Sequence, residues 1–420
     1  MIYFYHFLSL FIAIFLLPLF SIATLFSKHK FKGLIHHFGW VPKNKGKKTL
    51  WMHSLSMGEV VAATPVLKKV REQYPDLEIA LSVTTDSGYE SALNAGIADH
   101  LFFHPLDCLP FTQLALSRIN PVIYVVTDTG FWPGLIDLLY RKNIPVLLFN
   151  GRISERSARK YRLVGSLFKE TFKKFQKLGM QNRNSKKAAL MLGVEQDRVE
   201  IMGDPKYDVK QLLDSEGIEK LRDTFMLDKN TPVWIAGSTH AGEEEIILEA
   251  HQQLVVEHPD LILILAPRRI ERVKNIADIF EQKKVSFAYR SSLNNSKSAS
   301  VILLDTMGEL AQVFALGQVA FIGNSLVKPG GGHSLKEPLV YGLSVMHGPF
   351  IENIRHVAEK AHEQGLTFPV QTPDDIKEIV NSFLKNPDQR KEIQEKAQSF
   401  IKEQQGASEK MVQAISEILG

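Results

Sequence analysis

Cysteine is almost missing from this chain, since Cys108 is the only one among 420 residues. One thiol cannot form a disulfide within the chain, and it has no companion for a cysteine-rich metal site. The chain also lacks low-complexity tracts and repeats of short period. The soluble part is therefore expected to be an ordinary cytosolic globule.

Neither sign of charge is in large excess. The 50 Lys and Arg residues against 46 Asp and Glu residues give a net charge of +4, which excludes little. Hydrophobic residues make up 45% and charged residues 23%, as in globular proteins. Because 420 residues exceed one ordinary core, two domains are predicted.

Charged side chains are missing from residues 1–27. The segment Ile2–Phe26 is apolar apart from Tyr3, Tyr5, His6, Ser9, Ser21 and Thr24. As a helix it would be long enough to span a bilayer core of about 30 Å. The sequence predicts a membrane anchor at residues 1–27, either spanning the membrane or lying partly in it.

Lysines come directly after this apolar segment, at Lys28, Lys30 and Lys32, and no acid occurs in residues 28–50. The positive-inside rule places this flank, and the rest of the chain, in the cytoplasm. A cleaved signal peptide would have the opposite order, with the charge before the apolar segment.

The remaining sequence alternates short apolar segments with amphipathic ones. The predicted strands are Thr49–His53, Leu77–Val83, His100–Phe103, Pro121–Val126 and Pro145–Phe149, then Pro232–Ala236, Leu261–Leu265, Val301–Leu304, Gln318–Ile322 and Leu343–Met346. This alternation predicts an α/β fold of two doubly wound, Rossmann-like domains with a cleft between them. We expect the domains at 28–205 and 206–420, with a boundary near Asp204–Asn230 and a helical C-terminal segment, Pro387–Leu419.

A glycine-rich loop follows one predicted strand of the second series, at Lys328–Ser334. Its three consecutive glycines allow close approach of backbone to a ligand, and Ser334 can cap the next helix. Glu337 lies in the first turn, where it can accept hydrogen bonds from ribose hydroxyls. The loop favours nucleotide-sugar binding, and it is not a P-loop because the Gly-Lys-Ser/Thr ending is missing.

An ordered series of motifs extends from the anchor to about residue 360. The motifs are His53–Glu59, Trp132-Pro133, Asn150–Ser157, Gly203–Lys206, Ala236–Glu243, Ala266–Arg268, Asp305–Leu310, Gly323–Leu326, Gly331–His333, Glu337-Pro338 and Gly348-Pro349 with Asn353. In this series the chain resembles the 3-deoxy-D-manno-octulosonic acid (Kdo) transferases specific for lipid IVA, a branch of the GT-B glycosyltransferases. The resemblance covers most of the chain.

The resemblance implies an inverting transfer of Kdo from CMP-Kdo to a lipid A precursor in lipopolysaccharide biosynthesis, at the cytoplasmic side of the inner membrane. It implies no metal and no other cofactor. It also implies that the last helix packs back on the N-terminal domain.

Sugar transfer with inversion needs one base to accept the proton of the attacking hydroxyl. Glu59 is the candidate, because it lies after a strand at a loop-to-helix junction, and its family counterpart is the proton acceptor. The structural alternative is a first-turn glutamate that complements the helix dipole. The resemblance assigns transition-state stabilisation to Lys206 and Asp128, whose ordinary roles would be a solvated linker lysine and a strand-end cap.

The resemblance also locates the CMP site, and Arg268 suits a phosphate or carboxylate ligand. The implied nucleotide-binding residues are Arg268, Arg269, Met307, Gly308, Glu309, Ser334, Leu335, Lys336 and Glu337.

The chain departs from the family pattern at three places. Asp128-Thr129-Gly130 stands where Glu-Thr-Glu is usual, so one acid is shorter and another is missing. Ser334, Leu335 and Lys336 replace Asn, Pro and Leu, and Arg268 is followed by Arg269 instead of histidine. All three departures fall in the expected donor site and transition-state environment.

A basic stretch, Arg152–Lys187, has twelve Lys and Arg residues and two acids. The spacing of Leu167, Phe172 and Phe175 within it favours an amphipathic basic helix on an anionic membrane surface. A solvated helix face is the structural alternative. Nucleic-acid binding is not expected beside a membrane anchor.

Two other functions remain open at this point. Another GT-B lipid glycosyltransferase would prefer a different nucleotide, for instance a UDP-sugar. A non-catalytic membrane-bound paralogue would bind its ligand without depending on Glu59.

Overall fold

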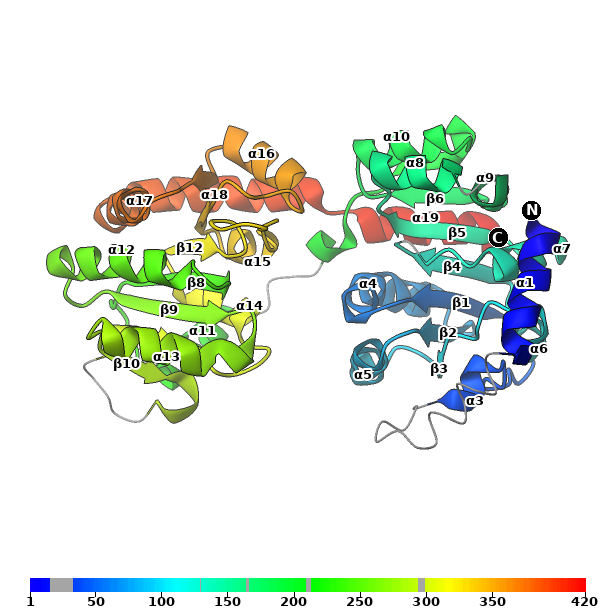
Figure 1. Ribbon diagram of the computed structural model, residues 1–420, viewed down its shortest axis with the longest axis horizontal. Coiled ribbons are helices and arrows are strands. Elements are labelled where there is room, and N and C mark those ends of the chain that lie inside the picture. The colour runs from blue at the N-terminus through cyan, green and yellow to red at the C-terminus, as the bar shows by residue number, and fades with distance from the viewer. Residues whose placement is uncertain (16–32, 129, 164–165, 209–212, 294–298) are drawn as a thin grey trace. The chain divides into compact units, whose positions relative to one another are not determined.

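The computed structural model describes residues 1–15, 33–128, 130–163, 166–208, 213–293 and 299–420 (Figure 1). The chain forms two compact units. Unit 1 comprises Met1–Val209 with Gln404–Gly420, and unit 2 comprises Lys210–Glu403. Each unit is built on one sheet of seven parallel strands.

The sheet of unit 1 has the order β3-β2-β1-β4-β5-β6-β7. Its strands are β1 (Thr49–Ser54), β2 (Glu78–Val83), β3 (His100–Phe103), β4 (Ile123–Thr127), β5 (Val146–Gly151), β6 (Lys177–Met180) and β7 (Val199–Ile201). Every pair is parallel, with Leu50 opposite Ile79 on one side and Ile123 on the other. The central strands are buried along their whole length because helices cover both faces.

Two apolar cores lie on the two faces of this sheet, because successive strand side chains point to opposite sides. Trp51, Tyr124 and Leu148 belong to one core. Their strand neighbours Met52 and Val125 belong to the other, which also contains residues of the C-terminal helix.

The helices of unit 1 are α1 (Ile2–Phe15), α3 (Leu34–His37), α4 (Met57–Gln73), α5 (Asp86–Ala95), α6 (Leu109–Ile119), α7 (Pro133–Arg141), α8 (Glu155–Leu163), α9 (Ser166–Phe172), α10 (Arg183–Met191) and α19 (Ala407–Leu419), with the short 3-10 turns η1 (Gln196–Arg198) and η2 (Pro205–Asp208). Helix α19 packs on α4 and η2 within the unit. The carboxylate of Asp208 accepts hydrogen bonds from the N–H groups of Gly406 and Ser408, which holds the start of α19.

The sheet of unit 2 has the order β10-β11-β9-β8-β12-β13-β14. Its strands are β8 (Val233–Thr239), β9 (Ile262–Pro267), β10 (Phe287–Tyr289), β11 (Val301–Leu303), β12 (Val319–Ile322), β13 (Ser344–His347) and β14 (Thr367–Pro369). Its helices are α11 (Ser215–Thr224), α12 (Glu244–Glu257), α13 (Val273–Gln282), α14 (Leu310–Val313), α15 (Lys336–Val340), α16 (Arg355–Glu363), α17 (Pro373–Lys385) and α18 (Pro387–Gln404), and its 3-10 turns are η3 (Ile270–Arg272), η4 (Arg290–Ser292) and η5 (Phe314–Leu316).

The α/β fold class with two doubly wound units is confirmed. All ten predicted strands exist, with ends that differ from the prediction by at most three residues. The C-terminal segment is helical, but α18 and α19 are separate helices because Gly406 between them adopts a left-handed φ of 102°.

The prediction of one amphipathic basic helix in Arg152–Lys187 is wrong. The stretch contains α8, α9, strand β6 and the beginning of α10. Leu167, Phe172 and Phe175 are only 8%, 0% and 0% exposed, because they pack in the core of unit 1. Their apolar surface is therefore not available to a membrane.

The predicted anchor at residues 1–27 is described only in part. Residues 2–15 form α1, and residues 16–27 lie outside the described residues. Among the residues that the structure describes, no helix is both long and apolar enough to cross a bilayer. Helix α1 lies beside α6 and α7 (Figure 1). The hydroxyl of Tyr5 donates to Asp107 (2.6 Å), and His6 Nε2 lies 3.3 Å from Asp137.

Candidate active site

The strands of unit 1 all end at one edge of its sheet, because they are parallel. The chain continues from β1 to β2 on one side and later forms β4 on the other side of β1. Ligands of doubly wound sheets bind beside such a reversal, at the carboxyl ends of the strands. Glu59 follows β1 and Asp128 follows β4, so both predicted residues lie at this place.

Glu59 is in the first turn of α4, and its carboxylate is partly buried. Its Oε2 atom accepts a hydrogen bond from the Leu55 N–H (2.6 Å) and lies 3.1 Å from the Thr127 hydroxyl. In the described part of the chain, Oε1 has no hydrogen-bond partner. Burial raises the pKa of Glu59 above its ordinary value, although the Leu55 N–H opposes this. A raised pKa suits a group that accepts a proton near neutral pH.

Asp128 is buried and forms an ion pair with Arg152, which follows β5. The guanidinium donates from Nε (2.8 Å) and from a terminal nitrogen to the same carboxylate oxygen. Asp128 also has a left-handed φ of 59°, a conformation that is uncommon for non-glycine residues and concentrates at functional sites. Arg152 itself is half exposed, with 52% of its side chain accessible.

Arg152 joins this candidate site, although the sequence alone does not single it out. Its pKa is raised: burial opposes this, but the hydrogen bond and charge of Asp128 outweigh it, with smaller contributions from Asp204 and Glu59. The Arg152 guanidinium is therefore near the carboxylates of Asp128, Glu59 and Asp204. Asp204 lies two residues before Lys206. The sequence feature that could have indicated Arg152 is its position directly after a buried strand, within the motif Asn150–Ser157.

Lys206 lies in η2, which packs on α4. Its backbone N–H donates to the Asp204 carboxylate (2.9 Å), which fixes the turn. No described residue forms an ion pair with its side-chain ammonium. Lys206 is thus a partly exposed cation in a turn that packs on α4, the helix that carries Glu59. Its catalytic role stays a prediction.

Aromatic rings pack against one another next to this edge of the sheet in unit 1. The ring of His53 lies 4.0 Å from that of His104, which stacks on Trp132 at 4.9 Å. Burial lowers the pKa of His53 to about 3, so this histidine is neutral at physiological pH. It is a packing residue and not a cationic catalyst.

Gly130, one departure from the family pattern, lies close to the Leu55 side chain. A Cβ atom at this position would lie 2.5 Å from Leu55 Cδ1 and 3.2 Å from the His53 ring. A side chain at residue 130 would therefore require the Leu55 side chain to shift. Glycine at this position avoids that shift beside the residue whose N–H holds Glu59.

The predicted nucleotide-binding residues all lie beyond the carboxyl ends of strands in unit 2. Arg268 and Arg269 follow β9, Met307 to Glu309 follow β11, and Ser334 to Glu337 follow β12. Because β11, β9, β8 and β12 are consecutive in the sheet, these loops line one edge. The structure brings the predicted set together there, and its ligand contacts stay a prediction.

The side chains of this set differ in how free they are. Met307 is 78% exposed, and Gly308 beside it has a φ of 88°. Glu309 accepts a hydrogen bond from Arg290 Nε at 3.0 Å, so part of its carboxylate is already occupied. Ser334 accepts from the Lys336 N–H (3.3 Å), whereas the residue in the capping position is Leu335.

His240 and His333 also lie at this edge, and the sequence did not single them out as candidate site residues. Their Nε2 atoms lie 3.1 Å apart, although they come from the loops after β8 and β12. Burial, with the charges of His240 and Arg268, lowers the pKa of His333 to about 4. A nearby Arg268 and two imidazoles form a surface that offers hydrogen-bond donors to an anion.

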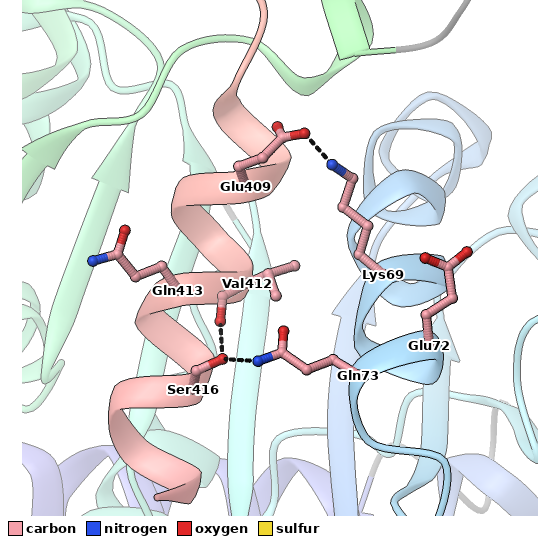
Figure 2. A pocket seen from close by; sticks show the side chains of 7 residues that line it. All are labelled: Lys69, Glu72, Gln73, Glu409, Val412, Gln413 and Ser416. Atoms are coloured by element: carbon pink, nitrogen blue, oxygen red, sulfur yellow. Dashed lines mark hydrogen bonds and ion pairs between the residues drawn. The ribbon is translucent and has the colours of Figure 1, made fainter.

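A separate groove of about 650 Å³ lies between α4 and α19 (Figure 2). Lys69 and Glu409 form an ion pair across it, and Gln73 donates to Ser416 (3.2 Å). Lys69 is ten residues along α4 from Glu59, which corresponds to about 15 Å of helix. This groove is therefore a helix–helix seam and not part of the candidate site.

Residues 32–209 match a family model described as 3-deoxy-D-manno-octulosonic-acid transferase. The 3-deoxy-D-manno-octulosonic acid transferase of Haemophilus influenzae is 33% identical over 378 residues, covering 88% of this chain and 87% of that protein.

Solved structures agree on the fold. A glycosyltransferase from Rickettsia africae has a TM-score of 0.64 at 13% identity, covering 89% of this chain and 99% of that chain. UDP-GlcNAc 2-epimerase from Neisseria meningitidis has a TM-score of 0.60 at 15% identity, covering 88% and 100%. At these identities only the two-domain α/β fold of GT-B type is shared, whereas the sequence relationship shows the chemistry: this chain belongs to the Kdo transferase family and is a glycosyltransferase that transfers Kdo in lipopolysaccharide biosynthesis.

Proposed function

We propose that this protein transfers Kdo from CMP-Kdo to lipid IVA, with inversion and without a metal ion. The acceptor hydroxyl oxygen forms a bond to the anomeric carbon of Kdo while the bond from that carbon to the CMP phosphate breaks. CMP leaves with the bonding electrons, and the proton of the hydroxyl passes to Glu59.

The observation that carries the proposal is the environment of Glu59. One carboxylate oxygen is held by the Leu55 N–H, and burial raises the pKa of the group. A base held in this way has a fixed direction, and its raised pKa makes it a better proton acceptor. A glutamate that served only the helix dipole would need neither the hydrogen bond back to Leu55 nor the shielding from water.

Cations supply the proposed electrostatic support for the departing phosphate. Lys206 carries an ammonium that no described residue pairs with, and Arg268 contributes to the charge around His333. Fixed positive groups stabilise charge that develops on a leaving phosphate. We assign the same supporting role to the Asp128–Arg152 pair, which fixes the guanidinium beside Glu59.

We also propose that the protein works at the inner membrane, with both units on the cytoplasmic side. Support comes from α1, where Phe4, Phe7 and Phe11 are 63%, 67% and 50% exposed. Exposed aromatic and aliphatic side chains on one helix fit the interface of a bilayer, which also holds a lipid acceptor. The lysines after residue 27 add attraction to anionic lipids.

Nucleotide preference separates this proposal from another GT-B glycosyltransferase. Titration calorimetry of the detergent-solubilised protein with CMP, UMP and UDP is the first test. Binding of CMP at least tenfold tighter than UMP and UDP is expected. Preference for UDP would overturn the choice of donor and leave the fold and family unaffected.

A further inference from the structure

Glu243 is a fully buried carboxylate that the proposed chemistry does not use. It lies just before α12, in the loop after β8, and its exposed fraction is 0%. A charged group without solvent is stable only where hydrogen bonds satisfy it. In unit 2, two loops provide the hydrogen bonds to Glu243.

Four backbone N–H groups converge on this carboxylate, each at 2.8 Å. Oε2 accepts from His240 and Asn324, and Oε1 accepts from Ser325 and Leu326. A carboxylate has about four acceptor positions, so all of them are filled by the loops after β8 and β12. Charge-assisted hydrogen bonds of this kind are the strong ones.

These two loops meet where the strand order of unit 2 reverses. The chain passes from β8 to β9 on one side, and β12 lies on the other side of β8. Backbone meets backbone there, since a Cβ at Gly323 would lie 2.3 Å from the Ser238 carbonyl oxygen. Glu243 therefore joins the two loops at the position where a doubly wound sheet binds its ligand.

The hydrogen bonds continue from Asn324 into the glycine-rich loop. The Asn324 carbonyl accepts from the Gly332 N–H (2.7 Å), and the next residue, His333, contacts the ring of His240. His240 is itself held through its N–H by Glu243. One carboxylate thus fixes both the loop that carries His240 and the loop that leads to His333 and Ser334.

We propose that Glu243 is a positioning residue for the nucleotide-sugar donor, acting through the backbone of His240 and of Asn324 to Leu326. It does not touch the donor; it holds the donor-binding loops in their binding conformation before the donor arrives. Such preorganisation lowers the cost of ordering the loops on binding, so its loss weakens donor binding more than turnover. This inference rests on the proposed CMP-Kdo activity.

The test compares Glu243→Gln with Glu244→Gln. The amide in Glu243→Gln keeps one acceptor oxygen and turns N–H donors toward two of the backbone N–H groups. Glu244 is equally buried and adjacent, but it is ion-paired with Arg272 (2.6 Å) and not with the loops. Both variants remove one buried charge, so general destabilisation is matched.

The expected result is a rise of at least tenfold in the KM for CMP-Kdo and in the Kd for CMP in Glu243→Gln, with kcat lowered less than threefold. Glu244→Gln is expected to lower the melting temperature without changing either constant. A merely structural role of Glu243 would reduce the amount of active protein and leave KM and Kd unchanged, and that outcome would overturn the inference. If the wild type itself neither binds CMP nor transfers Kdo, the proposed function is overturned instead.

A second measurement does not depend on the variant folding. Hydrogen–deuterium exchange of the ligand-free wild type reports the amides of Asn324, Ser325 and Leu326 directly. Exchange as slow as that of strand β12 supports loops that are fixed before binding. Rapid exchange that becomes slow only when CMP is added would contradict it.

Discussion

At the scale of single residues, the candidate site depends on polar groups that hold other polar groups. Thr127 is an example, because its hydroxyl lies 3.1 Å from Glu59 and 3.0 Å from the His53 carbonyl. Its hydrogen bond stabilises the ionised form of Glu59 and so opposes the rise in pKa that burial causes.

Thr127→Val is therefore expected to raise the pKa of Glu59 further. The base acts only when deprotonated, so activity is lost as pH falls through this pKa, and the variant should lose it at a higher pH than the wild type. The pH dependence of kcat/KM for transfer measures this shift. Thr112→Val is the matched control, since the Thr112 hydroxyl bonds only to carbonyl groups of its own helix region. Coincident acid limbs in the wild type and Thr127→Val would refute the assignment.

The Asp128–Arg152 pair makes a second prediction. Arg152→Gln leaves the buried Asp128 carboxylate without its charged partner, which should lower the free energy of unfolding by about 1–3 kcal/mol. Removing the charge from both, in Asp128→Asn with Arg152→Gln, should recover part of this loss. Thermal unfolding of the two single variants and the double variant measures the coupling. Strictly additive losses would mean that the pair is not energetically coupled.

The sequence indicated some of these residues and not others for a physical reason. The positions of Glu59 and Lys206 could be predicted because each lies inside a local motif at a strand or turn end, and their catalytic roles stay predictions. Arg152, His240 and His333 acquire their partners only when distant loops meet at a sheet edge. The loop contact at Glu243 is likewise invisible in sequence, since its partners are backbone N–H groups.

At the scale of elements, every central strand was predicted, and so was the edge strand β3, but four short strands were missed. The missed strands β6, β7, β10 and β14 have three or four residues each and lie at or next to sheet edges. Edge strands are short and covered on fewer sides, so they lack the continuous β-branched apolar pattern of central strands. The prediction of an amphipathic basic helix in Arg152–Lys187 was wrong because its aromatic residues pack in the core of unit 1 and not on a membrane.

Helix α19 should be required for the stability of unit 1. Met411 is fully buried and packs in the core that lies beneath α4. Met411→Ala is expected to cost about 2–5 kcal/mol of unfolding free energy, because a cavity remains. Chemical denaturation measures it, with Val256→Ala, an exposed residue of unit 2, as the control. A loss below 0.5 kcal/mol, roughly that of a surface substitution, would contradict the packing.

Helix α1 should contribute to membrane binding through its exposed rings. Replacing Phe7 and Phe11 by serine removes apolar surface worth about 1.5–3 kcal/mol each when fully buried. The double variant should bind vesicles of anionic phospholipid at least tenfold more weakly, as measured by co-sedimentation. Val256→Ser, at an even more exposed apolar site in unit 2, should bind as the wild type does. Equal binding by all three proteins would exclude α1 from the membrane contact.

At the scale of the whole molecule, each unit has a glutamate at the reversal of strand order in its sheet, but the two carboxylates have different hydrogen-bond partners. In unit 1 the carboxylate of Glu59 lies at the reversal of strand order and keeps one oxygen without a described partner. In unit 2 the carboxylate of Glu243 lies at the corresponding reversal and is saturated by backbone. The first is suited to accept a proton, and the second is suited to hold loops.

The most direct test of the central claim is Kdo transfer from freshly prepared CMP-Kdo to lipid IVA by the full-length, detergent-solubilised protein. Wild type, Glu59→Gln and Glu72→Gln would be compared, since Glu72 is an exposed glutamate on the same helix. The account predicts transfer by the wild type and Glu72→Gln, and a kcat at least 100-fold lower in Glu59→Gln with the Kd for CMP unchanged, in the range known for loss of a general base. A Glu59→Gln protein that keeps more than a tenth of the wild-type kcat would contradict it.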